Sequence, residues 1–169
     1  MLVGSATLWV SYHQFWLLSD GADTNPLAEP GPLSFVELRP DAAMVRTGLS
    51  MGSIAVTVAQ LDGPPTSIDS SADWADVVEF SFTDEAVPPI VVVALESDPE
   101  PGVPDVSLDD SEQSLRVRVH AIGRDAGATY EPADSTEAYL IQVWRAVPAA
   151  AETLRANSTR AGTGIWVVR

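Results

Sequence analysis

The chain has 169 residues, with 24 acidic residues against nine arginines and no lysine, so its formal net charge is −15. Apolar residues make up 46% and charged residues 20% of the sequence, which is typical of a globular protein and excludes a disordered chain. With no cysteine, neither disulfides nor thiolate zinc sites can form. The length favours one folded domain spanning residues 1–169.

The acidic charge is concentrated in the middle of the sequence. Residues 47–115 contain 14 acids and no Lys, Arg or His, whereas residues 1–46 carry a net charge of −3 and residues 116–169 a net charge of +2. Such a distribution repels nucleic acid and anionic membranes and attracts cationic partners. A solvated surface under a compositional bias would show the same pattern, so the charge leaves both interpretations open.

The N-terminal apolar run does not have the pattern of a secretory signal. No basic residue precedes it, and Ser, Thr, His and Gln residues interrupt it, whereas a signal needs a positive start and an unbroken apolar stretch. No stretch approaches the roughly 20 apolar residues of a membrane helix. We therefore expect a cytoplasmic protein that binds neither membrane nor nucleic acid.

Strand-forming residues dominate the first half of the chain. Residues 7–18 are β-branched and aromatic and predict one strand, with apolar residues at both parities that indicate burial on both faces or a bulge. Residues 33–38 predict a short strand. Residues 43–49 and 53–61 predict a hairpin, in which Gly52 supplies the positive φ that a tight turn requires.

The second half continues the β pattern and ends in a predicted helix. Residues 74–82 and 115–122 alternate between apolar and polar side chains, as half-buried strands do. The unbroken apolar run at 90–95 predicts a central strand, and residues 138–144 a further strong strand. Residues 148–156 begin with Pro and are rich in Ala, which predicts a short helix. The loops are expected at 20–32, 97–113 and 123–136, and a closing strand or tail at 165–168.

Seven to nine short strands and one short C-terminal helix predict an all-β fold. The arrangement we expect is a two-sheet antiparallel β-sandwich of the jelly-roll or Greek-key type. No alternation of strands with helices indicates a parallel sheet, and no repeat of 20–50 residues indicates a propeller or solenoid.

The motifs of common enzymes and metal sites are missing from the sequence. The two histidines, His13 and His120, lie on separate predicted strands, and neither belongs to a local metal-binding spacing. The acidic loop at 98–112 does not match an EF-hand. There is no GxSxG nucleophile motif and no phosphate-binding loop. We therefore expect no catalytic residues, no bound metal and no cofactor.

A pocket in the mouth of the sheet is an alternative binding site, for a small ligand or a metal. Its polar groups would be Tyr12, His13, Arg118 and His120. The cationic stripe of Arg116, Arg118 and His120 is explained more simply by pairing with acids on a neighbouring strand. Exposed tryptophans would also mark a binding surface, as in sugar-binding sandwiches. The candidates are Trp9, Trp16, Trp74, Trp144 and Trp166, of which the last is expected at the surface.

Three stretches together resemble a known family. They are VSYHQFWLLSD at 10–20, WADVVEFSF at 74–82, and the pair LRVRVHAIGRD at 115–125 with AYLIQVW at 138–144. They look like the competence protein J family, which includes the DNA-entry nuclease inhibitor, and they also resemble small acidic actinobacterial proteins. The resemblance implies a β-sandwich and inhibition of a basic nuclease through an acidic face, and it transfers no individual site residue.

The leading hypothesis is a non-enzymatic protein-binding module, such as an inhibitor or immunity-type protein, whose acidic surface meets a cationic partner such as a nuclease. Electrostatic steering would speed the association of such a pair. A structural subunit that pairs edge strands is a further alternative, which leaves both a monomer and a homodimer open. The candidate partner-binding residues are Asp73, Asp76, Glu79, Asp84, Glu85, Glu96, Asp98, Glu100, Asp105, Asp109, Asp110 and Glu112.

Overall fold

The structure is a computed structural model that describes residues 1–24, 33–82, 86, 88–95, 98–99, 101–106, 114–126 and 136–159. Within these residues the regular structure is β, as the sequence predicts, and no helix there is long and apolar enough to span a membrane. The strands are β1 (Leu2–Ser11), β2 (Gln14–Leu18), β3 (Val36–Leu38), β4 (Ala42–Arg46), β5 (Met51–Gln60), β6 (Asp76–Ser81), β7 (Val91–Ala94), β8 (Ser114–Ile122), β9 (Ala138–Ala146) and β10 (Glu152–Ala156).

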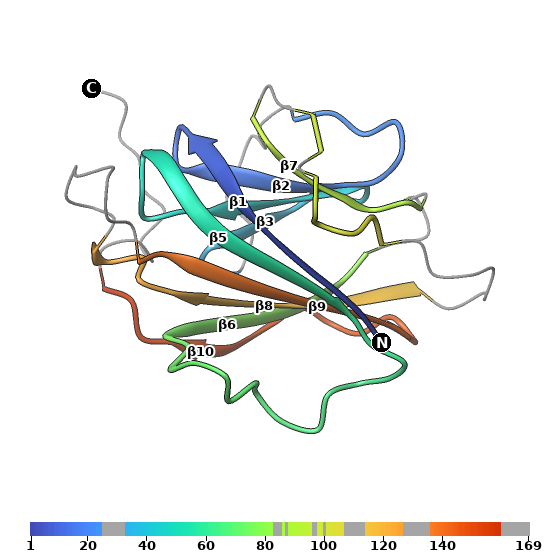
Figure 1. Ribbon diagram of the computed structural model, residues 1–169. Helices are drawn as coiled ribbons and strands as arrows, with labels where there is room; N and C mark the ends of the chain where they lie inside the picture. The colour runs from blue at the N-terminus through green and yellow to red at the C-terminus, as the bar shows by residue number, and fades with distance from the viewer. Residues whose placement is uncertain are drawn as a thin grey trace.

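The strands form one hydrogen-bonded sheet in the order β10-β6-β8-β9-β5-β1-β2-β4-β3, and β7 pairs with β2 beside this path. All pairs are antiparallel except β5 with β9. The pair Ser11 and Gln14 joins β1 to β2. Beyond this joint the two parts of the sheet diverge and curl over each other as an open half-barrel (Figure 1). The predicted arrangement of two separate sheets is not confirmed, because the path of paired strands is continuous.

The main hydrophobic core fills the space between the two parts of the curled sheet. Its members alternate along each strand, as the pattern of β5, β6 and β8 predicted. They include Leu8, Val10, Phe15, Leu17, Ile54, Val56, Val58, Val78, Phe80, Val117, Val119, Tyr139, Ile141 and Val143. Because a one-residue slip would move such a set to the opposite face, this alternation fixes the register of the strands.

The single strand predicted at 7–18 is two strands. The chain reverses at Tyr12 and His13, whose φ angles are 55° and 58°, the backbone of a two-residue hairpin turn of type I′. Apolar residues occur at both parities partly because the turn interrupts the alternation and partly because β2 is buried on both faces. Phe15 and Leu17 lie in the main core, and Trp16 and Leu18 lie in a second cluster. The turn has neither the Gly nor the Asn that normally announces it.

Two other pairing predictions are wrong. The strands β4 and β5 do not form a hairpin, since β4 pairs with β2 and β3 while β5 pairs with β1 and β9. Gly52 lies inside β5 with a φ of 138°. Strand β7 is a side branch on β2 rather than a central strand. The hairpin partner of β4 is β3, the strand directly before it. The pairings of β4 with β2 and of β5 with β1 and β9 join segments far apart in the chain, which local sequence does not reveal.

The helix predicted at 148–156 is also wrong, since Glu152–Ala156 forms strand β10. This strand pairs with β6, and its register shifts between Thr153 and Arg155. Strand β6 would otherwise present unpaired backbone groups at the edge of the sheet, and pairing with them outweighs the modest helix preference of Ala and Leu. The segment 165–168 and Trp166 lie outside the described residues.

Candidate functional site

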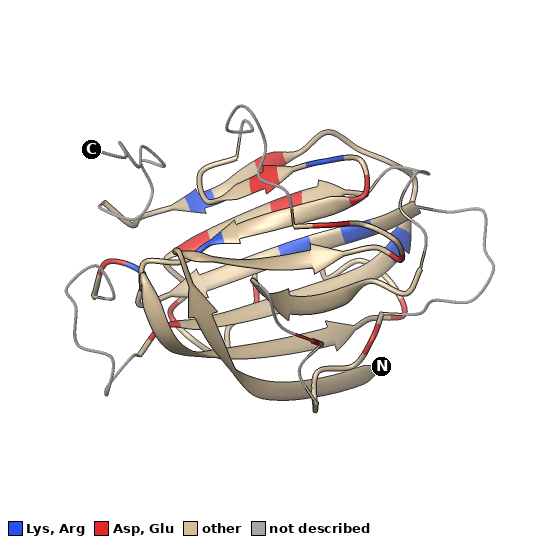
Figure 2. Cartoon of the chain, turned by 90° about the horizontal axis from the view of Figure 1, so that it is seen from above, with Lys and Arg blue, Asp and Glu red and all other residues tan. Residues whose placement is uncertain are grey.

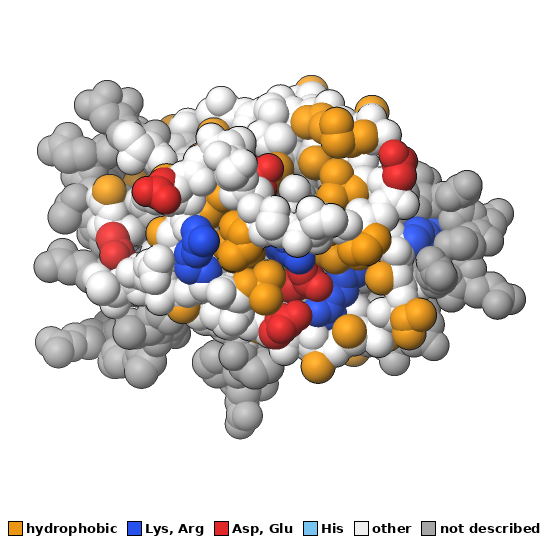
Figure 3. Space-filling model, turned by 90° about the horizontal axis from the view of Figure 1, so that it is seen from below, with side chains coloured by type: hydrophobic (Ala, Val, Ile, Leu, Met, Phe, Trp, Pro, Cys, Tyr) orange, Lys and Arg blue, Asp and Glu red, His pale blue; other side chains and the backbone are white. Residues whose placement is uncertain are grey.

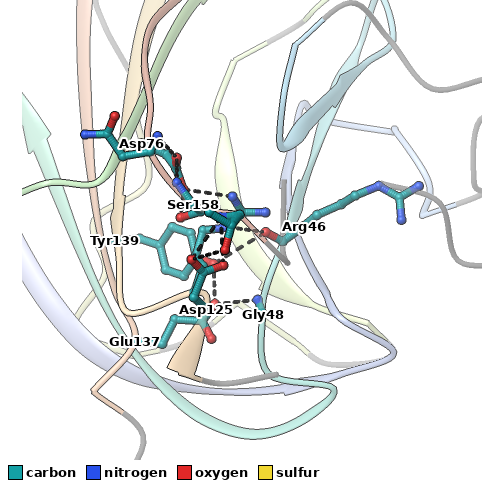
Figure 4. Close-up of polar contacts among 10 residues, drawn as sticks. Arg46, Gly48, Asp76, Asp125, Glu137, Tyr139 and Ser158 are labelled. Atoms are coloured by element: carbon teal, nitrogen blue, oxygen red, sulfur yellow. Dashed lines mark hydrogen bonds and ion pairs between the residues drawn. The ribbon is translucent and has the colours of Figure 1, made fainter. Parts of the chain in front are cut away.

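A network of buried polar groups links several chain segments at one end of the half-barrel (Figure 4). Arg124, which follows β8, donates to the carboxylate of Asp76 at the start of β6 over 2.9 Å and to the carbonyl oxygen of Arg46 over 3.2 Å. Asp76 also accepts bonds from the backbone amides of Asn157 and Ser158, both at 3.0 Å, and from the Ser158 hydroxyl. The ion pair thus ties the chain after β10 to β6 and to the end of β4.

Glu137 forms the second half of this network. Its carboxylate accepts the amides of Gly48 and Leu49 at 2.9 and 2.8 Å, and the hydroxyl of Tyr139. Burial raises the pKa of Glu137, although these three bonds and the Arg124 charge act in the opposite direction. Burial and the neighbouring Glu137 carboxylate raise the pKa of Tyr139 well above 10.

The contacts of this network hold several loops in place. Its partners come from the β4–β5 loop, the segments flanking β8 and β9, and the chain after β10. The approach is so close that a Cβ on Gly48 would lie 1.7 Å from the carbonyl oxygen of Arg124. In Figure 4 the side chain of Arg46 points away from the cluster, and only its carbonyl oxygen takes part. We therefore interpret this network as structural, since each donor and acceptor in it fixes a segment of the chain.

The predicted cationic stripe lies on the outer side of β8, where it is buried and paired. Arg116 and Arg118 donate from Nε to the two oxygens of Glu79 on β6, at 2.8 and 2.7 Å. Arg116 also donates to the carbonyls of Ala149 and Ala150, and Arg118 to the carbonyl of Ser67. The expected pairing with an acid on a neighbouring strand is therefore present. Figure 3 shows this side of the molecule, with charged side chains in its middle and hydrophobic ones around them.

His120 continues this outer side beneath the loop at 61–75. Its Nδ1 lies 3.2 Å from the carbonyl oxygen of Leu140, its Nε2 accepts the amide of Asp69 at 3.4 Å, and the ring of Trp74 lies 5.5 Å away. Burial lowers the pKa of His120, with the nearby Arg118 charge adding to the effect. Since the Nε2 accepts a bond and must lack a proton, His120 is a neutral packing histidine here.

His13 belongs to a different part of the molecule. Its amide donates to the carbonyl of Ser50 at 3.2 Å, its carbonyl accepts the amide of Thr47 at 2.9 Å, and its Nδ1 lies 3.2 Å from the Thr47 carbonyl. Partial burial lowers its pKa. The neighbouring Tyr12 is 74% exposed. The predicted pocket residues thus form two separate pairs, Tyr12–His13 in the β1–β2 turn and Arg118–His120 under the loop at 61–75.

The predicted acidic residues divide into buried and exposed groups. Asp76 and Glu79 are internal, at 2% and 8% exposure, and both neutralise arginines. Asp73, Asp98 and Asp105 are exposed. The remaining predicted residues, Asp84, Glu85, Glu96, Glu100, Asp109, Asp110 and Glu112, lie outside the described residues. No group of three His, Cys, Asp or Glu side chains in the described ranges is placed to hold a metal ion.

The arginines and the acids are distributed very differently between interior and surface. In the part of the chain that the structure describes, every arginine is buried or half-buried, with Arg116, Arg118 and Arg124 fully buried. The exposed acids there are Asp20, Asp23, Asp62, Asp73, Asp98, Asp105 and Glu152. Four carboxylates, those of Glu37, Asp76, Glu79 and Glu137, are buried as well, so the difference lies in the exposed positions, which carry acids and no arginine.

One outer surface has no charge at all. We call it the β1–β5 face, and it consists of the outward side chains Val3, Ser5, Thr7, Trp9 and Ser11 of β1 and Met51, Ser53, Ala55 and Thr57 of β5. Neither strand contains a charged residue, as Figure 2 shows for the strands beside the N-terminus. Trp9 is 55% exposed, whereas Trp16, Trp74 and Trp144 are buried. Sequence analysis gave Trp9 as one of five candidates for an exposed tryptophan, and the local pattern gave no sign of this difference.

Comparison of the chain with protein-family models, with curated proteins and with solved structures finds no match.

Proposed function

We propose that this protein is a non-enzymatic binding module of the cytoplasm whose acidic surface meets a cationic protein. The observation that supports this function is that the exposed charged side chains of the described residues are all acidic, since no arginine there is exposed. The exposed positions of the described residues therefore carry acids and no arginine, while the buried arginines Arg116, Arg118 and Arg124 are balanced by the buried carboxylates of Glu37, Asp76, Glu79 and Glu137. Such a field raises the rate at which a cationic protein associates and gives that rate a steep dependence on ionic strength.

An inhibitor or immunity-type protein for a basic nuclease fits this proposal, and the resemblance of the three stretches to the competence protein J family supports the same choice. Of the candidate residues, Asp73, Asp98 and Asp105 are exposed and are proposed to contribute to the contact. Asp76 and Glu79 are withdrawn from it, since both bind arginines inside the fold.

The test has two stages. Capture from a native lysate at low ionic strength should recover a basic protein, and the association rate of the purified pair should fall steeply as salt is added. The double variant Asp73→Lys/Asp105→Lys should lower that rate more than Asp20→Lys/Asp62→Lys, which makes the same charge change at exposed sites outside the candidate set. Recovery of no basic protein, or equal rates for the two double variants, would overturn the proposal.

A further inference from the structure

The loop at 61–75 is anchored at both ends by backbone hydrogen bonds to the sheet. Figure 1 shows it as the long connection from β5 to β6. The amide of Leu61 donates to the carbonyl oxygen of Val143 at 2.8 Å. At the other end, the amide of Ala75 donates to the carbonyl oxygen of Ala121 at 2.9 Å. The residues between these two ends are held by other contacts.

The middle of the loop bonds to two side chains of β8. Arg118 donates from Nη1 to the carbonyl oxygen of Ser67 at 2.8 Å. The amide of Asp69 donates to Nε2 of His120 at 3.4 Å. A guanidinium keeps its charge at every physiological pH, whereas an imidazole changes its charge between pH 5 and 8. Of these two bonds, the one to His120 is therefore the bond that a change of pH can break.

The partners of the two ring nitrogens fix the protonation state of His120. Its Nδ1 lies 3.2 Å from the carbonyl oxygen of Leu140, which can only accept, so Nδ1 carries a proton. Its Nε2 accepts the amide of Asp69 and carries none. A second proton can be added only at Nε2, where it would face the amide proton of Asp69. Protonation therefore replaces a hydrogen bond between the loop and the sheet by two opposed N–H groups.

Positive side chains approach His120 from two strands. Arg118 lies two residues before it on β8, and Arg155 reaches it from β10. On β6 the register partner of His120 is the uncharged Val77, and the outward carboxylate of that strand, Glu79, is already paired with Arg118. A charged ring would therefore repel two arginines and gain no partner from β6.

The carboxylate that acts on His120 from the loop is that of Asp69. Its Oδ1 accepts bonds from the amide and hydroxyl of Ser71 and from Nε1 of Trp74. From β9 the register partner of the ring is the uncharged Leu140. Burial lowers the pKa of His120 and the two arginines add to this effect, whereas the Leu140 bond and the Asp69 charge act in the opposite direction. The closed loop therefore favours the neutral ring.

We propose that His120 is a pH-sensitive switch, which holds the middle of the loop at 61–75 against β8 when it is neutral and releases it when it is protonated. The ends of the loop stay bonded to the sheet, and a local opening of this kind costs less free energy than unfolding. In the released state the ring meets water and regains its ordinary pKa of 6.5. The population of the released loop should therefore rise by up to about tenfold for each pH unit below that value.

Release of the loop uncovers a surface unlike the rest of the exposed surface. Ile68 of the loop packs against an apolar cluster that contains Val77 and Leu140. Beside this cluster lie Arg118 and the protonated His120. Since the exposed charged side chains of the described residues are otherwise acidic, the protein in acid presents an apolar and positively charged surface that it covers at neutral pH.

The loop also carries Asp73, one of the exposed acids proposed to meet the cationic partner. Release of the loop displaces this carboxylate, so association with that partner should weaken in acid. This consequence alone rests on the proposed function. The experiments that follow use the protein without a partner, so the switch and the proposed function can fail separately.

Amide hydrogen exchange of the full chain between pH 7.5 and 5.5 tests the switch, after correction for the intrinsic dependence of exchange on pH. The Asp69 amide should lose protection by several-fold, up to about tenfold. The amides that pair β8 with β9 should keep their protection, because the sheet stays intact. Constant protection at Asp69, a gain of protection there in acid, or an equal loss in β8 and β9 overturns the proposal.

Two glutamine variants identify the group that titrates. His120→Gln removes the imidazole and should give the Asp69 amide the same protection at both pH values. His13→Gln is the matched control, because the pKa of His13 is also lowered while its ring lies in the β1–β2 turn. A pH dependence that survives His120→Gln, or one that His13→Gln abolishes, overturns the proposal.

The wild-type ring provides a measurement that needs no substitution. The nitrogen chemical shifts of the His120 imidazole should show the proton on Nδ1 at pH 7.5, and protonation of Nε2 should coincide with the loss of protection at Asp69. A ring that carries its proton on Nε2 at pH 7.5, or one that titrates while the Asp69 amide stays protected, contradicts the switch even if His120→Gln does not fold.

Discussion

The outer side of β6, β8 and β10 and the β1–β5 face differ in charge and in coverage. The first contains Glu79, Arg116, Arg118 and His120, and the loop at 61–75 and the chain at 149–150 cover these side chains. The second contains no charge, and its side chains are largely exposed. The charged side chains that might have served a partner are thus bonded within the fold, whereas the uncharged face is left bare.

The comparison shows that residue type is a poor guide to which surface is available. Arginines on the outer side of a sheet can bind a partner or support the sheet's own covering loops. Here they donate hydrogen bonds to the carbonyl oxygens of Ser67, Ala149 and Ala150. The β1–β5 face has no such covering segment among the described residues. We therefore expect substitutions on the covered side to change the stability of the fold strongly, and substitutions on the bare face to change it little.

The largest effect is expected at Glu79. Glu79→Ala leaves Arg116 and Arg118 buried without their shared carboxylate, and removal of one partner of a buried ion pair costs about 3–5 kcal/mol of the free energy of unfolding. Trp9→Ala on the bare face should change that free energy by less than about 0.5 kcal/mol. Urea denaturation measures both. Equal losses for the two variants would remove the distinction between the covered side and the bare face.

The next effect is expected where the loops meet the buried polar network. Gly48→Ala forces a Cβ to within 1.7 Å of the Arg124 carbonyl oxygen, and the strain of such overpacking should destabilise the protein by about 3 kcal/mol. Gly63→Ala is the matched control, because a Cβ at Gly63 would meet nothing within 4 Å. The midpoints of urea denaturation should therefore separate the two alanine variants. Similar midpoints would show that the β4–β5 loop is not held by this network.

The third prediction concerns pH and the covered side. Burial lowers the pKa of His120 in the folded protein, so as the pH falls below the ordinary value of 6.5 the unfolded chain takes up a proton before the folded chain does. The contribution of His120 to stability is therefore present above pH 6.5 and is lost as the pH falls toward the lowered pKa. His120→Gln should reduce this loss.

The comparison with His120→Gln isolates one group among several that titrate. His13 has the same sign, since its pKa is also lowered. Glu137 has the opposite sign, because its pKa is raised from 4.5 and its contribution falls as the pH rises through that range. Denaturation midpoints measured between pH 5 and 7.5 should give a smaller slope for His120→Gln than for the wild-type protein. Identical slopes would show that His120 does not titrate differently on folding.

The elements that sequence analysis predicted correctly are those with a regular local signal. The alternation in β6 and β8 placed Val78, Phe80, Val117 and Val119 in the core and left Arg116 and Arg118 for the outer side, as the structure shows. The pairing of these arginines with an acid on a neighbouring strand was predictable for the same reason. Charged side chains at alternating positions of two paired strands can form ion pairs only where they project from the same side of the sheet.

Most of the predictions that failed depended on distant partners, and one depended on a local turn. The segment 152–156 has a helix-forming composition and becomes a strand because the edge of β6 is available to it. The ion pair of Asp76 with Arg124 joins positions 48 residues apart, in a strand and a loop, and no spacing predicts it. The exposure of Trp9 was not predicted because the turn at Tyr12 and His13 was not recognised. Once the chain reverses at Tyr12 and His13, Val10 and Phe15 face inward and Trp9 must face outward.

That turn gives the smallest predicted effect. Tyr12 has a φ of 55° and is 74% exposed, so it accepts left-handed backbone strain and buries little surface. Tyr12→Gly removes the strain, and the expected stabilisation is about 1 kcal/mol or less, because the flexibility that Gly adds to the unfolded chain offsets part of the gain. His13→Gly should instead destabilise the protein, because it removes the contact of Nδ1 with the Thr47 carbonyl and a half-buried ring. If Tyr12→Gly lowers the melting temperature as much as His13→Gly does, the Tyr12 ring contributes packing that its exposure does not show. The contrast between the covered side and the bare face would then need revision where β1 turns into β2.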